Sequence, residues 1–168
     1  GIKHYRICSS VMKLTKDNIL MEVTSFADRV KEVSFFNETE STNEYAKKCA
    51  KAGNIDENGK ISIIVADSQS GGKGTKGRSF LSPAGNSIYM SLLQKPDIPP
   101  AKASMLTIVA ALAVRKAIEE TSCVKAQIKW PNDIVLENKK LCGILTEMNA
   151  DMEKVNYVVT GIGVNVNN

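Results

Sequence analysis

A glycine-rich, basic stretch between two short apolar stretches limits the fold more than any other feature of this sequence. Residues 61–67 (ISIIVAD) are mostly β-branched and predict a strand, and residues 87–93 (SIYMSLL) predict another. Between them, the run from Gly72 to Gly77 matches G-x-G-x-x-G, but a dinucleotide-binding fold requires a helix to begin in this loop. Pro83 follows instead, and the chain returns to strand character. Because the G-x-x-x-x-G-K-[ST] string of a P-loop is also missing, both common nucleotide-binding folds are disfavoured.

The chemistry of this loop favours an anion as its ligand. Glycines allow backbone N–H groups to approach a phosphate or a carboxylate closely. Lys73, Lys76 and Arg78 add positive charge, and no acidic residue stands among them. A solvated surface loop that binds nothing is the alternative that these residues leave open.

Two further stretches predict helices. Ser41 and Glu44 match a helix-capping box, and Gly53 matches a helix stop. Residues 101–121 predict the longest helix, which we interpret as core scaffold. The apolar stripe expected on it consists of Met105, Val109, Leu112, Ala113 and Ile118.

Three more strand candidates close the chain, and the order of elements predicts a mixed α/β fold. Strands are expected at residues 126–130 and 156–166, and a hairpin over 134–148 that turns near Glu137 and Asn138. Hydrophobic residues make up 43% and charged residues 24%, which is typical of one soluble globular domain.

Composition excludes several chemistries. The formal charge of +4 is too small to indicate a nucleic-acid binder by itself. The four cysteines form no C-x-x-C pair, and the single histidine, His4, cannot complete a zinc site or serve a histidine-based triad near a terminus. The sequence has neither a long apolar run nor a secretory leader, so a cytoplasmic location is expected.

Two later motifs carry candidate ligand groups. In residues 129–133 (KWPND), Asp133 could hold Mg²⁺, although a polar turn beside a half-buried Trp130 explains the same letters. In residues 139–145 (KKLCGIL), one lysine could point inward beside Gly143 toward an anion. Cys142 in that run is interpreted as a core residue rather than a nucleophile.

Taken together and in order, these stretches resemble the biotin protein ligase family. The residues that carry the resemblance are 41–43, 69–78, 129–133, 139–145 with Glu147, and 161–165 (GIGVN), spread over about three quarters of the chain. The resemblance implies a fold of the α/β (α+β) class. In this fold a mixed β-sheet is flanked by helices, similar to the core of class II aminoacyl-tRNA synthetases. It also implies a reaction in which biotin and MgATP form biotinyl-AMP, and a lysine of a biotin carboxyl carrier protein then displaces AMP.

The resemblance also assigns roles to individual residues. Lys140, Arg78 and Lys73 correspond to the catalytic cations, and Asp133 to the Mg²⁺ ligand. The biotin-binding positions are Ser41, Thr42, Gln69, Gly72, Lys73, Lys140 and Gly143. The ATP-binding positions are Arg78, Phe80, Lys129, Asn132, Asp133 and Asn165.

This chain departs from the family in its glycine-rich loop. Where the family pattern reads G-R-G-R-x-G-R, this chain has Lys73 and Thr75 at the first two arginine positions. Phe80 stands where the family usually has a tryptophan. Lysine keeps the charge but not the bidentate fork, and threonine loses the charge. Retention of the adenylate is therefore expected to be weaker, unless Lys76 compensates.

Other assignments on the same fold stay open. A lipoate or octanoyl ligase or transferase is one, and a biotin-sensing transcriptional repressor module is another. Residues 1–10 are interpreted as the remnant of a preceding segment, such as a winged helix, so DNA would be bound only through a missing N-terminal domain. Residues 11–168 are interpreted as a catalytic domain truncated at its C-terminus, with reduced or absent full turnover expected. A homodimer is left open, and no membrane partner is expected.

Overall fold

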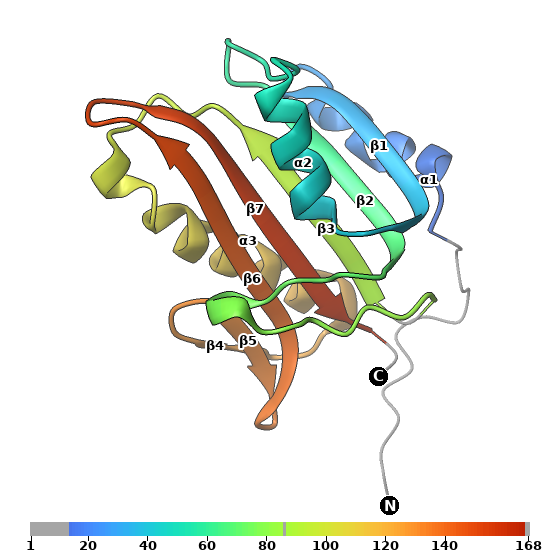
Figure 1. Ribbon diagram of the computed structural model, residues 1–168. Helices are drawn as coiled ribbons and strands as arrows, with labels where there is room; N and C mark the ends of the chain where they lie inside the picture. Colours follow the sequence, from blue (N-terminus) through green and yellow to red (C-terminus); the bar gives the residue numbers. More distant parts are fainter. Residues whose placement is uncertain (1–13, 86, 167–168) are drawn as a thin grey trace, which may run out of the picture.

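The computed structural model, which describes residues 14–85 and 87–166, is built on one seven-stranded sheet (Figure 1). The strand order is β1-β2-β3-β7-β6-β5-β4, in which β1 and β2 are parallel and every other neighbouring pair is antiparallel. The strands are β1 (Val30–Thr39), β2 (Ile61–Gln69), β3 (Ser87–Gln94), β4 (Gln127–Lys129), β5 (Asp133–Leu136), β6 (Lys139–Ala150) and β7 (Val155–Asn165). The mixed α/β prediction is confirmed.

The helices lie on opposite sides of this sheet. In Figure 1, α2 (Thr42–Lys51) crosses in front of the sheet, whereas α3 (Met105–Ser122) runs behind it. Helix α2 packs on β2, β3 and β7, and α3 packs on β4 to β7. A third helix, α1 (Lys16–Val23), packs against β1. Short 3₁₀ turns occur at Thr24–Phe26, Thr75–Gly77 and Pro100–Lys102.

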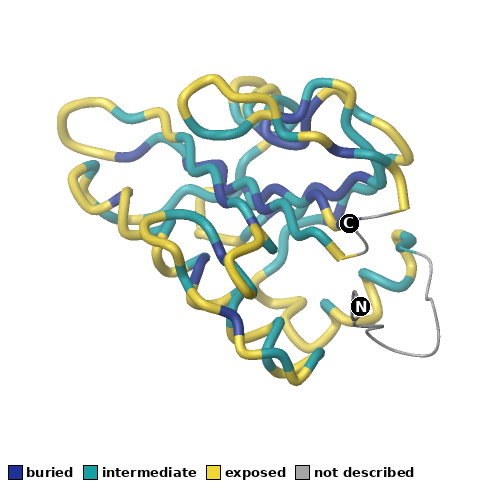
Figure 2. The backbone as a smooth tube through the Cα atoms, turned by 90° about the horizontal axis from the view of Figure 1, so that it is seen from below, coloured by how far each residue is buried: buried dark blue, intermediate teal, exposed yellow. Residues whose placement is uncertain are grey.

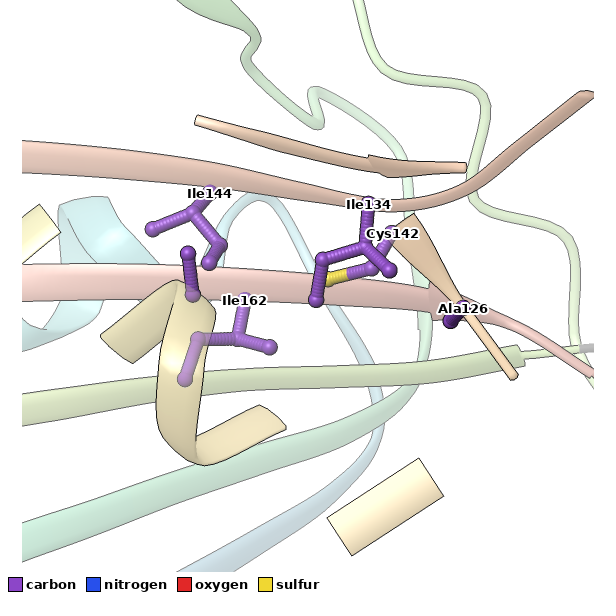
Figure 3. Packing of buried hydrophobic residues seen from close by; sticks show 6 residues of the cluster. Ala126, Ile134, Cys142, Ile144 and Ile162 are labelled. Atoms are coloured by element: carbon purple, nitrogen blue, oxygen red, sulfur yellow. The ribbon is translucent and has the colours of Figure 1, made fainter. Parts of the chain in front are cut away.

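An apolar core lies on each side of the sheet. Figure 3 shows the cluster between α3 and the sheet, where Ile134, Cys142, Ile144 and Ile162 lie next to one another on neighbouring strands. On the other side, Ala46 of α2 packs on buried side chains of the sheet: Ile64, Leu93 and Val159. Figure 2 shows that the buried residues gather in the interior, while many residues of the peripheral loops are exposed.

The capped helix was predicted correctly. Ser41 Oγ accepts a hydrogen bond from the backbone N–H of Glu44 at 3.4 Å, and α2 begins at Thr42. Gly53, with φ of 78°, follows the end of the helix in the left-handed region.

The predicted apolar stripe of α3 is wrong. Met105, Val109 and Leu112 are 57%, 57% and 51% exposed, and Ala113 is also exposed. The face that meets the sheet instead carries Ala110, Ala111, Val114 and Ile118. Because the first half of this helix is apolar on all sides, the sequence could not select the buried face. Of the predicted stripe, Ile118 alone packs on the core.

The strand predictions are confirmed within a few residues, and one strand was missed. The hairpin turns at Glu137 and Asn138, whose φ angles of 50° and 65° match a tight hairpin turn. Strand β1 was not predicted, and residues 1–10 with His4 lie outside the described residues. Trp130, expected to be half-buried in the turn interpretation, is 76% exposed.

No helix in residues 14–85 and 87–166 has the length and apolar character needed to span a lipid bilayer.

Candidate active site

A pocket opens on the α2 side of the sheet, where the start of α2, the end of β2 and the glycine-rich loop meet the middle of β3, β7 and β6. Sequence positions more than 100 residues apart thus contribute to one cavity. Its lining consists of Ser41, Thr42, Asn43, Gln69, Lys73, Gly74, Thr75, Phe80, Tyr89, Met90, Asn132, Lys140, Gly143, Ile144, Leu145, Gly161, Ile162 and Gly163.

Eight of the thirteen residues assigned by sequence line this pocket, and five lie outside its lining. The eight are Ser41, Thr42, Gln69, Lys73, Phe80, Asn132, Lys140 and Gly143. The five are Gly72, Arg78, Lys129, Asp133 and Asn165.

The five outside residues fall into two groups. Arg78 and Lys129 are exposed and lie outside the pocket lining, so their assignment to ATP stays a prediction. The other three, Gly72, Asp133 and Asn165, each contact a residue that lines the pocket. Gly72, at the start of the loop, packs closely against Phe80 at its end, because a Cβ there would be 2.4 Å from the carbonyl oxygen of Phe80. Asn165 Nδ2 donates to the carbonyl oxygen of Lys140 at 3.0 Å, and Asp133 pairs with the Lys140 side chain.

One end of the pocket is a network of amide and hydroxyl groups. Gln69 Oε1 accepts from the backbone N–H of Thr42 at 2.9 Å and lies 3.1 Å from its hydroxyl. Gln69 Nε2 donates to Ser82 Oγ at 3.0 Å, so both ends of the amide are engaged. Ser91, fully buried on β3, lies 2.7 Å from the Thr42 hydroxyl. These groups can exchange hydrogen bonds with a polar ring that enters the pocket.

Asn43 holds this end of the pocket to the centre of the sheet, a role that the sequence analysis missed. Its Nδ2 donates to Glu147 Oε2 at 2.8 Å, and its Oδ1 accepts from Ser91 Oγ at 2.6 Å. A Cβ on Gly161 would lie 2.3 Å from Asn43 Oδ1. The signal was available in the sequence, since Asn43 and Gly161 both stand in stretches that carry the family resemblance.

Tyr89 and Ser91 were missed for a different reason. Period-two alternation in β3 directs Ser87, Tyr89 and Ser91 to one side of the strand, and all three are buried. The sequence predicted this strand, but no role was assigned to its polar side chains. Alternation would have grouped these polar side chains on one face.

Lys140 supplies a cation to the pocket. Its Nζ lies 2.8 Å from Asp133 Oδ1 and 5.9 Å from the centroid of the Phe80 ring. The ion pair does not have hydrogen-bond geometry, so the buried Asp133 Oδ1 has no hydrogen-bond donor within the part of the chain that the structure describes.

Two glycines directly opposite each other on β6 and β7 receive the Phe80 ring. Gly143 pairs with Gly163 in the sheet. A Cβ on Gly163 would lie 2.7 Å from two ring carbons of Phe80, and one on Gly143 would lie 2.8 Å from Cε of Lys140. Phe80 also packs edge-on against Tyr89 with ring centroids 6.4 Å apart. The absence of side chains at these two positions therefore fixes where the ring and the ammonium lie.

We expect Gly163→Ala to lower the melting temperature by a few degrees, because the added methyl group must displace the Phe80 ring. Overpacking of this kind costs about 1–2 kcal/mol, or roughly 2–8 °C for a chain of this size. Thermal unfolding measures the effect. Phe80→Leu in the Gly163→Ala background should recover part of it, and a Gly163→Ala protein that melts like wild type would contradict the contact.

The glycine-rich loop is a small closed structure in which backbone groups bond to one another. Phe80 N–H donates to the Gly72 carbonyl at 2.8 Å, and Gly74 N–H donates to the Arg78 carbonyl at 2.7 Å. At its tip, Lys76 has a left-handed φ of 58°. Lys73, Gly74 and Thr75 face the pocket, so Thr75 contributes a hydroxyl where the family pattern has an arginine.

Cys142 is a core residue, as the sequence indicated. Its side chain is fully buried in the cluster beneath α3. Burial raises the pKa of the thiol to about 12, despite the opposing effect of Lys140. A thiol in that state is protonated at neutral pH and is a poor nucleophile.

The donor set fits a magnesium ion only together with substrate phosphates. Among residues 14–85 and 87–166, no group of three His, Cys, Asp or Glu side chains could enclose a metal. Asp133 offers one buried carboxylate oxygen that lacks a hydrogen bond. Mg²⁺ is commonly held by one or two carboxylates, phosphate oxygens and water, so one carboxylate beside the pocket is compatible with it.

Comparison with known proteins identifies the family of this chain. Residues 35–165 match the biotin/lipoate A/B protein ligase family. The chain is 49% identical over 105 residues to the bifunctional ligase/repressor BirA of Bacillus subtilis, which covers 62% of this chain and 32% of that protein. It is 38% identical over 106 residues to the biotin–[acetyl-CoA-carboxylase] ligase of Paracoccus denitrificans, covering 61% and 43%.

Solved structures show the same fold. The biotin protein ligase of Aquifex aeolicus in complex with biotin and ATP superposes with a TM-score of 0.65 at 32% identity, over 82% of this chain and 53% of that one. The Leishmania major biotin protein ligase in complex with biotinyl-5-AMP gives 0.62 at 27% identity, over 80% and 57%. The matched region thus amounts to between a third and somewhat more than half of these relatives' length. With the family pattern matched over residues 35–165 and the sheet shared with these enzymes, the chain belongs to the biotin/lipoate A/B protein ligase family.

Proposed function

We propose that this chain carries the catalytic site of an ATP-dependent biotin protein ligase, which forms biotinyl-5′-AMP and transfers biotin to a lysine of a biotin carboxyl carrier protein. The observation that carries the proposal is the pocket itself. Its lining combines amide and hydroxyl groups, around Thr42 and Gln69, with two cationic side chains, Lys73 and Lys140. A ligand that carries both a polar ring and a carboxylate matches both kinds of group.

The two relatives with bound ligands support the choice of substrates. The Aquifex enzyme was solved with biotin and ATP, and the Leishmania enzyme with biotinyl-5-AMP. In this chain, Ser41, Thr42, Gln69 and Gly143 are assigned to biotin, with Gly72 supporting the loop. Phe80 and Asn132 are assigned to the nucleotide, and Asp133, Asn165, Arg78 and Lys129 to its outer contacts.

The chemistry needs cations more than a proton acceptor. A carboxylate is already ionised at neutral pH, so its oxygen can attack the α-phosphorus and release pyrophosphate without a general base. The obstacle is the repulsion between the two anions, which Lys73 and Lys140 would reduce from the pocket lining. Mg²⁺, held by Asp133 together with phosphate oxygens, would supply further charge neutralisation. In the second step the acceptor amine attacks the mixed anhydride, and AMP leaves.

The direct test is adenylate formation by the purified chain. Biotin and MgATP should yield biotinyl-AMP and pyrophosphate, and calorimetry should detect biotin but not lipoate. A protein that binds neither biotin nor the adenylate would overturn the proposal. Transfer to a biotin carboxyl carrier protein is scored separately, because the chain spans only part of its relatives' length.

A thiol-dependent acyl transferase is the main competitor, and Cys142 separates the two. We expect Cys142→Ala to retain adenylate formation within about twofold of wild type, since this thiol is buried and protonated. A cavity-related loss of stability of about 1 kcal/mol is expected and is measured alongside. Abolished activity in a folded Cys142→Ala protein would favour the transferase.

Further assignments belong to the same proposal. We assign a cytoplasmic location, and a role in transcriptional repression only where a DNA-binding segment accompanies this domain. The name of the Bacillus relative, a bifunctional ligase/repressor, supports the second assignment.

A further inference from the structure

A chain of alternating charges connects the glycine-rich loop to the centre of the sheet. Lys73 Nζ lies 2.5 Å from Glu44 Oε1, and Lys47 Nζ lies 2.8 Å from the same oxygen. Lys47 Nζ is also 2.8 Å from Glu147 Oε1. Glu44 therefore stands between the loop cation and a second lysine on its own helix.

These groups differ in how firmly they are held. The Glu44 and Lys47 side chains are 23% and 20% exposed, whereas Lys73 is 52% exposed. Hydrogen bonds from Lys47 and then Lys73 lower the pKa of Glu44 to about 2, so Glu44 is ionised at neutral pH. Lys73 is the exposed, exchangeable partner, and Lys47 is the fixed one.

Lys73 also lines the pocket and is the loop side chain that carries positive charge there. A ligand carboxylate or phosphate that recruits this ammonium must take it from Glu44. Lys47 remains 2.8 Å from Glu44, so the exchange leaves no unpaired carboxylate behind. The geometry thus permits the loop to change partners at low cost.

We propose that Glu44 is a positioning residue that holds the glycine-rich loop through Lys73 in the empty pocket and competes with the anionic ligand for that lysine. This inference rests on the proposed function for the identity of the ligand, a biotinyl adenylate. The Glu44–Lys73 contact, which holds the loop when the pocket is empty, does not depend on the identity of the ligand. Two measurable consequences follow for a variant without the Glu44 charge: the loop of the empty protein loosens, and the ligand binds more tightly.

In the empty protein, Glu44→Gln should loosen the loop. Trypsin cleavage after Lys76 requires local opening of the loop, and its rate follows the population of the open form. We expect cleavage three to ten times faster than in wild type. Glu120→Gln is the matched control, because Glu120 pairs with Lys116 on α3, on the opposite side of the sheet. In a Lys73→Gln background, adding Glu44→Gln should change the cleavage rate little.

With ligand, Glu44→Gln should bind more tightly. A non-hydrolysable biotinyl-adenylate analogue is expected to bind two to five times better in calorimetry, since Lys73 no longer has to leave a carboxylate. A residue with only a structural role would loosen the loop and weaken binding together.

The outcomes separate the two proposals. Faster cleavage with tighter binding supports the role of Glu44, whereas unchanged cleavage overturns it whatever the ligand result. Faster cleavage with equal or weaker binding overturns the competition and leaves a structural contact. If wild type does not bind the analogue, the proposed function is wrong, and so is the inferred competition between Glu44 and the ligand. The cleavage rate still tests whether Glu44 holds the loop in the empty protein.

Discussion

Lys140→Gln is expected to slow adenylate formation at least about 100-fold, because it removes a cation of the pocket lining that, in the proposed reaction, reduces the repulsion between the two anionic substrates. Hydrogen bonds to charged groups contribute about 1.5–3 kcal/mol each, so affinity for a biotinyl-adenylate analogue should fall roughly 10- to 100-fold. Quenched-flow assays of pyrophosphate release and calorimetry measure the two effects.

The same substitution breaks the pair with Asp133, so stability must be separated from binding. Asp133 has a buried oxygen without a hydrogen bond, and removing Lys140 leaves its charge without that partner. The double variant Lys140→Gln/Asp133→Asn should recover thermal stability but not ligand affinity. Undiminished adenylate formation in a folded Lys140→Gln protein would remove Lys140 from the site.

Gly161→Ala is expected to be the most destabilising of the glycine substitutions in the pocket. Its methyl carbon would lie 2.3 Å from Asn43 Oδ1, and the Asn43 amide cannot move without losing the bond from Ser91 to Oδ1 and the bond from Nδ2 to Glu147. A buried polar group left without its partner costs about 1–3 kcal/mol, and two such bonds are at risk. We expect a loss of about 3 kcal/mol, or roughly 6–12 °C in melting temperature.

Thermal and urea unfolding measure this loss, with Gly74→Ala as the control. Gly74 is in the loop, has a φ of −113°, and a Cβ there would meet its nearest neighbour at 3.4 Å, an ordinary contact. The control should unfold within about 1 kcal/mol of wild type. Equal stability of the two variants would show that Asn43 is free to move and does not anchor the pocket.

The sequence predicted elements with local signals and failed where tertiary contacts decide. Helix α2 was located because Ser41 and Gly53 mark its ends chemically. The hairpin was located because Glu137 and Asn138 lie between apolar strands. Strand β1 alternates poorly and pairs in parallel with β2 at the sheet edge, so its sequence carries no comparable signal.

The face of α3 illustrates the limit most clearly. Met105 and Val109 were assigned to the core because they are large and correctly spaced, yet Ala111 is fully buried and they are not. Small residues allow a helix to approach a sheet closely, and period-based reasoning weights large residues more heavily. The choice between two apolar faces depends on the sheet beneath, which the helix sequence does not contain.

The candidate site was predicted as a set of residues, but not as a geometry. Family-like stretches identified Lys73 and Lys140, which line one pocket with Gln69. They did not reveal that Arg78 lies outside it or that Asn43 links the pocket to Glu147. Those facts depend on backbone path and on side-chain partners more than 100 positions away in the chain.

The central claim is that Lys73 and Lys140 hold a vitamin carboxylate and a nucleotide phosphate together over the glycine-lined strands. A crystal structure of the protein with a biotinyl-adenylate analogue tests it most directly. We predict the acyl-phosphate linkage within hydrogen-bond distance of both ammonium groups, and the polar ring beside Thr42 and Gln69. An analogue bound elsewhere, or excluded from the crystal at saturating concentration, would contradict the account.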